Sequence, residues 1–346
     1  MNWDERIINE RELKEFLKDG DDRNLASFVK ALIEHQKQTW PLLNEGYRSL
    51  EAIETKSFQV RESSVVVQHN PARRRSTAAR VDRAAVEARG CFLCSDALPP
   101  EEKGIAYGDL MILCNPFPVL DEHLSIVDRR HTEQKIAGNV ETLLSLARDL
   151  GPQFFVLYNG PQCGASAPDH LHFQACSREI LPIERDLGAD EPSATEDCAV
   201  CAESRNNFEL FTLADCARSV VIFRGNRGET VAAWIYKTLA ALAGDWNSEP
   251  MVNLIATHDP AGWTVYLFPR ARHRPYCFYA EGEEQLMISP GAIDMAGVVV
   301  VPERDHFERV TAERLEEIFA EVSLNVEEVD FRIEQASETP VSEGLF

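Results

Sequence analysis

Two histidines and a glutamine alternate along one short stretch of the chain, at His170, His172 and Gln174. Leu171 and Phe173 stand between them. Because a β-strand points successive side chains to opposite faces, a strand here would place the three polar groups on one face and the two apolar groups in the core. Two imidazoles and an amide on one face could form a reactive site. The alternative is two unrelated surface histidines.

The segment before this motif favours the functional interpretation. An apolar run at residues 154–158 is followed by a polar loop that contains glycine and proline. A strand, a tight loop and a second strand that carries the histidines would hold a reactive group at the edge of a sheet. We therefore favour a functional site over two unrelated histidines.

Two cysteines at metal-ligand spacing, Cys91 and Cys94, lie earlier in the chain. The two intervening residues let both thiolates bind one metal ion from a tight turn, but the pair supplies only half of a site. His131 precedes a stretch with helical apolar spacing, for which Thr132 is the predicted N-cap. A histidine just before a helix would be held rigidly as a ligand.

A second cysteine pair, Cys198 and Cys201, falls in or just beyond an acidic segment rich in small residues. It could be incidental, could form another metal half-site, or could join Cys91 and Cys94 in a four-cysteine site. The total of nine cysteines is odd, and the chain is long enough not to need disulfides. The two pairs therefore indicate metal binding rather than a disulfide framework.

Two groups of arginines are candidates for anion binding. One begins at Arg73, in a run of three arginines, and the other consists of Arg270, Arg272, His273 and Arg274. The planar guanidinium offers paired, permanently charged donors that suit phosphate oxygens. For the first group, the alternative is a solvated basic turn.

The charge balance limits the choice of partners. The 346 residues include 35 Lys and Arg against 57 Asp and Glu, which gives a net charge of −22. Such a surface repels nucleic acid and anionic membranes, so we expect neither as a partner. The charged N-terminus lacks the apolar core of a signal peptide, and no apolar run reaches the ~20 residues that span a bilayer, so we expect a cytoplasmic protein.

The order of the predicted elements divides the chain into four parts. Residues 1–58 form an N-terminal helical segment, 59–188 a half that contains the histidines, 189–204 a linker, and 205–346 a second half. The second half repeats the order strand, helix, strand, strand, but it has no His-x-His. We therefore expect one active site per chain.

The stretch from His170 to Gln174 resembles the His-x-His-x-Gln signature of one branch of the histidine-triad superfamily. That branch contains galactose-1-phosphate uridylyltransferase, diadenosine tetraphosphate phosphorylase and the GDP-hexose phosphorylases, and the wider pattern is most similar to an uncharacterised bacterial domain family within it. The resemblance covers roughly residues 60 to 330, and its further motifs are Asn70–Arg73, Cys91–Cys94, Asn115–Pro118, His131–Thr132, Phe268–Arg270 and Ala280–Gln285.

The resemblance implies an α+β fold of two tandem histidine-triad-like halves, with antiparallel sheets and packed helices. It implies that His172 attacks the α-phosphorus of a nucleotide and forms a nucleotidyl-histidine, which a second acceptor then discharges. A backbone carbonyl on the other ring nitrogen would fix the tautomer of this imidazole. The groups that would hold the phosphates are Gln174, Ser166 and the amides of Gly164 and Ala165, and Asn159 matches an asparagine of the family.

The resemblance also implies a structural zinc ion. In the uridylyltransferases zinc is held by a cysteine pair, a histidine before a helix and the first histidine of the motif. The corresponding residues here are Cys91, Cys94, His131 and His170. Leu171 replaces the proline of the uridylyltransferases, and their second, histidine-rich metal site has no counterpart, which puts uridylyl transfer to galactose 1-phosphate in doubt.

The expected enzyme is a nucleotidyltransferase or phosphorylase that acts on an NDP-sugar or a dinucleoside polyphosphate. Its acceptor would be phosphate or a sugar phosphate, and a homodimer is compatible with the sequence. In the hydrolase branch of the superfamily a third histidine occupies the position of Gln174, so glutamine favours transfer over hydrolysis. Two alternatives stay open, a hydrolase of nucleotide phosphoanhydrides and a zinc-stabilised nucleotide-binding protein without catalysis.

Overall fold

The structure, a computed structural model, describes residues 2–18, 22–178, 180–186, 199–205, 207–213, 217–243 and 249–338. The chain begins with helices α1 (Glu10–Leu13), α2 (Leu25–Thr39) and α3 (Pro41–Glu51) and the 3-10 turns η1 (Trp3–Glu5) and η2 (Lys14–Phe16). The segment predicted to be helical, residues 1–58, thus runs into the first strand, β1 (Glu54–Val60).

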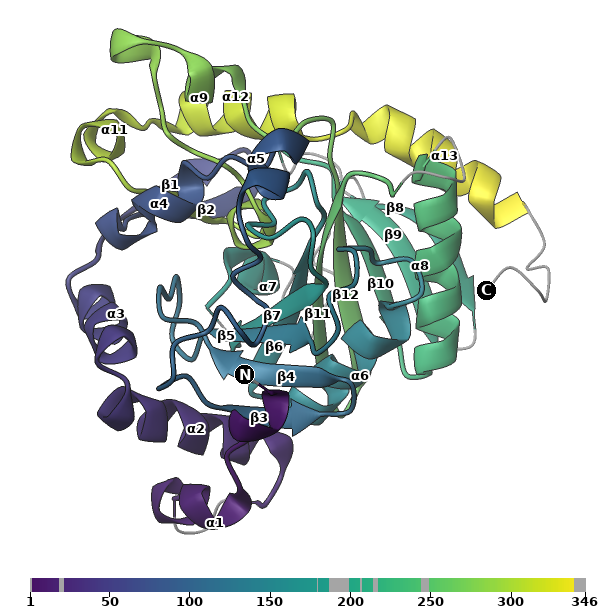
Figure 1. Cartoon of the computed structure of the whole chain (residues 1–346). Coiled ribbons are helices and arrows are strands. Elements are labelled where there is room, and N and C mark those ends of the chain that lie inside the picture. Colours follow the sequence, from purple (N-terminus) through teal and green to yellow (C-terminus); the bar gives the residue numbers. More distant parts are fainter. Residues whose placement is uncertain are drawn as a thin grey trace.

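One antiparallel sheet of ten strands forms the centre of the molecule (Figure 1). The strands of the first half are β3 (Gly104–Tyr107), β4 (Leu110–Cys114), β5 (Leu124–Asp128), β6 (Phe154–Asn159) and β7 (His172–Ser177). Those of the second half are β8 (Ala199–Arg205), β9 (Phe208–Leu213), β10 (Val221–Gly225), β11 (Val252–Asp259) and β12 (Gly262–Pro269). Their spatial order is β3-β4-β5-β7-β6-β11-β12-β10-β9-β8.

Read from either edge, the sheet has the same topology. From one edge the order is β3-β4-β5-β7-β6, and from the other it is β8-β9-β10-β12-β11. In each half, the last two strands of the chain therefore lie in reversed spatial order. A helix separates the third and fourth strands of each half, α6 (Val140–Leu150) in the first and α8 (Gly228–Ala243) in the second. The halves join through the β6–β11 pair, where Asn159 lies opposite Asn253. The α+β fold of two similar halves is therefore confirmed.

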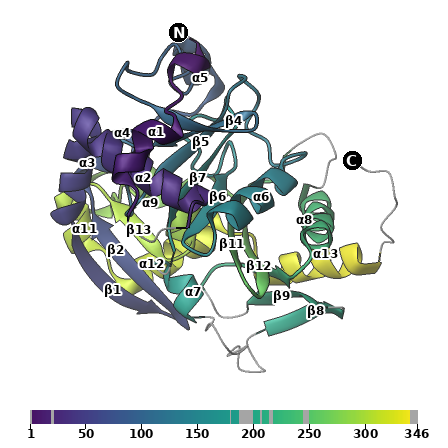
Figure 2. The same cartoon turned by 90° about the horizontal axis from the view of Figure 1, so that it is seen from below.

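Helices and a second, smaller sheet cover the two faces of the ten-stranded sheet. Apolar side chains of α2, α6, α8 and α13 (Val326–Glu338) form one core with the first face. The other face packs against a three-stranded sheet of β1, β2 (Ser63–His69) and β13 (Val298–Val301) (Figure 2). The remaining elements are η3 (Pro71–Arg73), α4 (Arg74–Thr77), α5 (Arg83–Ala88), α7 (Pro182–Asp186), α9 (Tyr276–Tyr279), η4 (Gly282–Glu284), α10 (Ala292–Met295), α11 (Arg304–Arg309) and α12 (Ala312–Val322).

Strand β7 carries the alternation that the sequence predicted. Leu171, Phe173 and Ala175 are buried in the core beneath α6. His172 and Gln174 point to the opposite face of the sheet, where a pocket lies. The period of two therefore places His172 and Gln174 together, as expected for a strand with one face in the core. His170 precedes the strand, and its side chain lies with Cys91, Cys94 and His131 instead of at the pocket.

The helix predicted to begin at Thr132 begins later. α6 starts at Val140 with Asn139 at its N-cap position, and the Thr132 hydroxyl instead donates to Asp128 Oδ2 at 2.9 Å. Gly138, with φ of 78°, interrupts the helical path before α6. Thr132 is thus not an N-cap, and the prediction that His131 sits directly before a helix is wrong.

Part of the predicted linker cannot be compared with the structure. Residues 189–198, including Cys198, lie outside the described residues, and the side chain of Cys201 in β8 is likewise not described. Within the described ranges, no helix is both long and apolar enough to cross a membrane.

Candidate active site

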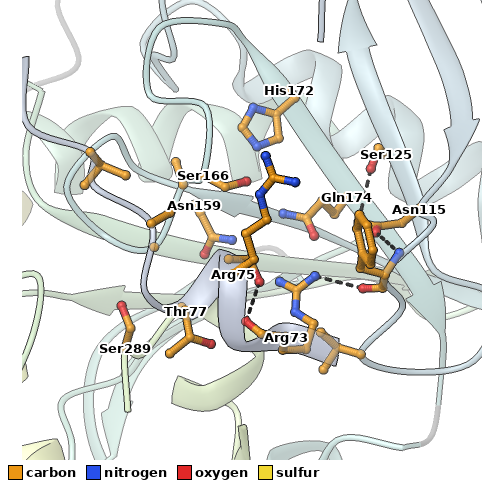
Figure 3. Close-up of a pocket in the computed structure, with 18 of the residues that line it drawn as sticks. Arg73, Arg75, Thr77, Asn115, Ser125, Asn159, Ser166, His172, Gln174 and Ser289 are labelled. Atoms are coloured by element: carbon orange, nitrogen blue, oxygen red, sulfur yellow. Dashed lines mark hydrogen bonds between the residues drawn. The ribbon is translucent and has the colours of Figure 1, made fainter. Parts of the chain in front are cut away.

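A pocket of about 640 Å³ lies over the end of β7, on the face opposite α6. Its walls come from segments far apart in the sequence: the turn at 72–80, the loop at 113–119, the loop before β7 and residues 273–300. This volume is within the range of small-molecule sites. His172, Gln174, Asn159 and Ser166 all face it (Figure 3).

His172 is held in one tautomer. Its Nδ1 lies 2.8 Å from the backbone carbonyl oxygen of His170, and a carbonyl can only accept, so Nδ1 carries the proton. The lone pair is therefore on Nε2. Burial lowers the pKa of His172 to about 4, which keeps the imidazole neutral near pH 7. This is the hydrogen bond predicted from the resemblance, and it leaves a nucleophilic nitrogen for the pocket.

Gln134 holds the strand that carries His172, and this residue was not among those predicted from the sequence. The backbone of β6 pairs with β7 only up to Leu157 and Gln174, and beyond that the strands separate. The Gln134 amide fills the gap: its Nε2 donates to the carbonyls of Asn159 and His172 at 2.9 and 3.1 Å, and its Oε1 accepts from the His172 N–H at 2.8 Å. No pattern in the sequence marks this residue, because its role depends on where the two strands part.

The loop before β7 brings main-chain groups to the pocket. Gly164, Ala165 and Ser166 line the pocket. At Gly164 the backbone has a φ of 95°, and a Cβ would lie 2.8 Å from Gly291 Cα, so only glycine fits at this position. Arg89 fixes the loop by donating to the Ser166 carbonyl at 3.0 Å and to Asp169 at 3.3 Å. The structure thus brings these three predicted residues to the same pocket as His172.

Five arginines line the pocket, and they differ in how they are bound: Arg73, Arg75, Arg80, Arg89 and Arg274. Arg73 donates to the Phe117 carbonyl at 2.8 Å, and Arg274 donates to the carbonyls of Thr77 and Ala79 at 2.9 and 2.8 Å. Arg75 has no partner within the part of the chain that the structure describes, and its guanidinium points toward His172 in Figure 3. Of the three consecutive arginines 73–75, Arg75 is thus the one whose guanidinium has no partner among the described residues. Residue type did not distinguish it from the other two.

The second predicted group is divided: His273 and Arg274 line the pocket, whereas Arg270 and Arg272 do not. Arg270 is 2% exposed, and its guanidinium donates to four carbonyl oxygens and to Asn253 Oδ1. Arg272 stacks on Tyr276, with the guanidinium carbon 4.1 Å from the ring centroid. Neither presents a donor to the pocket in this structure. Residue type does not reveal whether the donors of an arginine are already engaged by backbone carbonyls.

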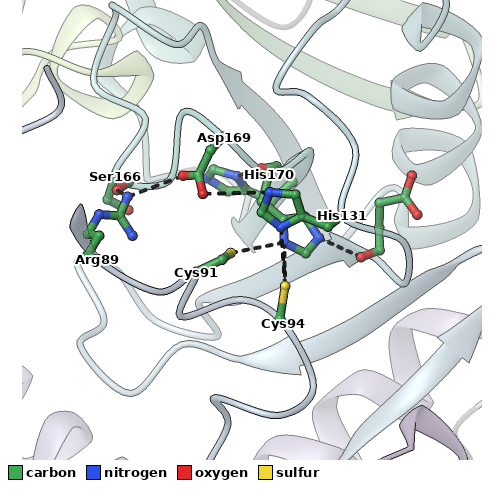
Figure 4. A network of polar contacts seen from close by, with 9 residues as sticks. Arg89, Cys91, Cys94, His131, Ser166, Asp169 and His170 are labelled. Carbon is green, nitrogen blue, oxygen red and sulfur yellow. Dashed lines mark hydrogen bonds and ion pairs between the residues drawn. The ribbon is translucent and has the colours of Figure 1, made fainter. Parts of the chain in front are cut away.

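The four predicted metal ligands lie together next to the pocket (Figure 4). Cys91 Sγ is 3.2 Å from His170 Nδ1, Cys94 Sγ is 3.2 Å from His131 Nδ1, and all four ligand atoms are within 4.8 Å of one another. Tetrahedral bonds of about 2.3 Å to sulfur and about 2.0 Å to nitrogen put neighbouring ligands roughly 3.5 Å apart. The cluster therefore has the size that one metal ion requires.

The outer nitrogen of His170 also fits a metal site. His170 Nε2 lies 2.7 Å from the carbonyl oxygen of Asp128, and His131 Nε2 lies 3.8 Å from Asp169 Oδ2. The carbonyl at Nε2 of His170 places the proton there and leaves the lone pair on Nδ1, which faces the thiols. The separation of 3.8 Å between His131 and Asp169 is longer than a hydrogen bond. The Asp128 carbonyl thus orients His170 as a ligand.

The buried side chain of His123 leads to a prediction about how the stability of the protein depends on pH. Complete burial lowers the pKa of His123 in the folded state to about 3, against about 6.5 in an unfolded chain. The stability that neutral His123 contributes is present above pH 6.5 and is lost as the pH falls toward 3, because the unfolded chain takes up the proton first. Between pH 7 and pH 5, we expect His123 to lower the free energy of unfolding by about 2 kcal/mol.

Chemical denaturation at pH 7 and pH 5 measures this loss in the wild type and in His123→Asn. Asparagine does not titrate and can still accept a hydrogen bond from the Val119 N–H, so the variant should lose about 2 kcal/mol less between the two pH values. An equal loss in both proteins would show that His123 is not the neutral, buried group described here.

Comparisons with known proteins agree with this architecture. Residues 32–177 match the family described as "Domain of unknown function (DUF4922)", and residues 191–334 match "GDPGP1-like, C-terminal domain". No curated protein matches the sequence. The two matches therefore fall one on each half of the chain.

Among solved structures, yeast Ap4A phosphorylase Apa2 in complex with Ap4A matches with a TM-score of 0.52 at 16% identity, over 84% of this chain and 97% of that one. Its complex with AMP gives 0.51 at 16% identity, over 84% and 96%. A structure of uridylyltransferase gives 0.39 at 14% identity, over 68% and 86%. At these identities, the phosphorylase structures establish a common fold.

Proposed function

We propose that the chain belongs to the branch of the histidine-triad superfamily that contains Ap4A phosphorylase and the GDP-hexose phosphorylases, and that it is a nucleotidyltransferase of the phosphorylase type. Its donor would be an NDP-sugar or a dinucleoside polyphosphate. The observation that carries the proposal is the neutral imidazole of His172, whose Nδ1 is bound by the His170 carbonyl and whose Nε2 lone pair is free at a pocket lined by arginines.

The proposed reaction has two displacements at one phosphorus atom. The Nε2 lone pair of His172 attacks the α-phosphorus, the P–N bond forms, and the P–O bond to the leaving phosphate group breaks. The positive charge that develops on the ring is stabilised by the Nδ1–H bond to the His170 carbonyl at 2.8 Å. An oxygen of phosphate or of a sugar phosphate then attacks the same phosphorus, the P–N bond breaks, and His172 returns to its neutral form.

The surrounding groups would neutralise the phosphates. Arg75 points at the site where the α-phosphorus must lie to react with His172 (Figure 3). Ser166, Gly164 and Ala165 also line the pocket. Donors fixed before the reaction stabilise the charge of a phosphoryl transition state more effectively than mobile water does.

We further propose that the metal at the cluster is zinc with a structural role. Two thiolates and two imidazoles in a closed set of four are typical of structural zinc. Cys91, Cys94, His131 and His170 would hold it. Because the carbonyl of His170 binds Nδ1 of His172, fixing His170 also fixes the nucleophile.

Incubation with NTPs, NDP-sugars and dinucleoside polyphosphates, followed by intact-protein mass spectrometry, tests the function. We expect a nucleotidyl adduct with at least one donor, and its mass identifies the base. Inorganic phosphate should discharge the adduct much faster than water does. Turnover that is independent of phosphate would favour the hydrolase, and the absence of an adduct and of turnover with every donor would favour a binding protein.

A second prediction concerns Arg75. We expect Arg75→Gln to slow adduct formation by about 10²- to 10³-fold, the usual loss for one donor to a developing anion. Single-turnover mass spectrometry measures the rate. Arg74→Gln is the matched control, because Arg74 is adjacent but is paired with Glu303 at 2.6 Å and does not line the pocket. Equal losses in the two variants would contradict a specific role for Arg75.

A further inference from the structure

Two of the amide side chains that line the pocket, those of Gln174 and Asn159, are held through their oxygen atoms. Gln174 Oε1 lies 2.7 Å from His123 Nε2. Asn159 Oδ1 lies 2.7 Å from Asn253 Nδ2 and accepts from the Ala292 N–H at 2.8 Å. An amide has one oxygen and one NH2 group, so an oxygen that is held on the protein side leaves the NH2 group for the pocket.

The first hydrogen-bond chain begins at a backbone N–H, which can only donate. The Val119 N–H donates to His123 Nδ1 at 3.1 Å, so the proton of this neutral imidazole must be on Nε2. Nε2 therefore donates, and the atom of Gln174 that faces it must be the oxygen. The Asn115 amide nitrogen is farther from Nε2, at 3.5 Å, and donates to Ser125 Oγ at 3.3 Å.

The second chain begins at a guanidinium, which also can only donate. Arg270 Nη1 donates to Asn253 Oδ1 at 2.6 Å, which fixes the orientation of the Asn253 amide. Asn253 Nδ2 then donates to Asn159 Oδ1 at 2.7 Å and to the Cys163 carbonyl at 2.6 Å. Asn253 is completely buried, so no water competes for these bonds.

The two chains come from different halves of the molecule. His123 adjoins β5 of the first half, whereas Arg270 and Asn253 belong to the second half. Asn253 lies opposite Asn159 in the β6–β11 pair that joins the halves. The second half, which has no His-x-His, thus reaches the active site through a hydrogen bond at the junction.

We propose that His123, and Arg270 acting through Asn253, are positioning residues that turn the amides of Gln174 and Asn159 so that both NH2 groups point into the pocket. The proposal rests on the proposed function in one respect, that the groups these amides receive are phosphoryl oxygens. Arg270 then has a role that differs from direct phosphate binding. A reversed amide would present its oxygen to the phosphate, and the like charges would repel.

The first test needs no substrate. Long-range ¹H–¹⁵N correlation spectra of the full-length protein at pH 7 distinguish the two neutral tautomers of each histidine, and His123→Asn assigns the signals. We expect His123 in the Nε2–H tautomer. An Nδ1–H tautomer or a charged ring would overturn the first chain, whether or not the protein is a nucleotidyltransferase.

The second test is a double-mutant cycle on the rate of adduct formation, with the donor that labels the wild type in the panel described above. We expect His123→Leu to slow the reaction by about 10- to 100-fold in the wild-type background, less than the loss of the donor itself. In a Gln174→Leu background it should change the rate less than about 2-fold, because its target is gone. Equal losses of rate in both backgrounds would show that His123 does not act through Gln174.

Asn253→Asp tests the second chain in the same way. A carboxylate can accept from Arg270, which favours folding, but it cannot donate to Asn159. We expect a loss of about 10- to 100-fold, and little further loss in an Asn159→Ala background. An unchanged rate in Asn253→Asp would overturn this chain. If the wild type forms no adduct with any donor, the proposed function fails, and the tautomer of His123 still decides how Gln174 is oriented.

Discussion

Replacing His172 with alanine is expected to abolish the nucleotidyl adduct and to lower turnover by on the order of 10⁴-fold or more. His172 supplies the electron pair of the P–N bond, and no other imidazole nitrogen in the described part of the pocket is both free and adjacent to Arg75. The adduct is measured by intact-protein mass spectrometry, and turnover by release of the leaving phosphate compound.

The control for this experiment is His69→Ala. His69 belongs to β2, contacts Phe307 and does not line the pocket, so the variant should form the adduct at the wild-type rate. A persistent adduct in His172→Ala would assign the nucleophile to another residue. Normal turnover without an adduct would contradict covalent catalysis.

The loss of the metal should have the second large effect. We expect purified protein to contain about one zinc ion per chain and Cys91→Ser to lose it. Structural zinc commonly contributes ~10–16 kcal/mol of apparent binding free energy, much of which is folding free energy. The thermal midpoint should therefore fall on the order of 10 °C. Adduct formation should slow as well, because the carbonyl of His170 binds the His172 ring.

Metal analysis and thermal unfolding of the same samples measure both effects. Cys277→Ser is the matched control, since Cys277 is a half-buried free cysteine outside the cluster. It should keep the metal and the wild-type midpoint. Wild-type protein that is well folded and contains no zinc would refute the structural zinc site.

The orientation of the central motif could be predicted from the sequence because it depends on a local period. Successive residues of β7 alternate between the faces of the sheet, so an apolar residue at 173 fixes the direction of those at 172 and 174. The cysteine half of the cluster was also predictable, because the spacing of Cys91 and Cys94 lets both thiols reach one point, whereas His131 and His170 were added through the family resemblance. The repeated order of strands and helices indicated two halves.

Other predictions failed where residue type was used in place of geometry. Thr132 is a good N-cap residue, but its hydroxyl bonds Asp128, and the helix begins only after Gly138. Arg270 has the chemistry of a phosphate ligand, but backbone carbonyls and Asn253 occupy its donors. The hydrogen-bond partners of both residues depend on how the chain folds around them and not on the preferences of the residue type.

The sequence by itself determined that His172 and Gln174 lie on one strand face, and its resemblance to the superfamily grouped Cys91, Cys94, His131 and His170 as candidate metal ligands. Only the tertiary structure decided how these groups are directed. Gln134 fills a gap between strands, Arg75 is the arginine of its run that is free at the pocket, and Arg270 reaches the site through Asn253. The physical reason is that a hydrogen bond has a direction, and that direction is set by donors and acceptors from distant segments, which no local pattern contains.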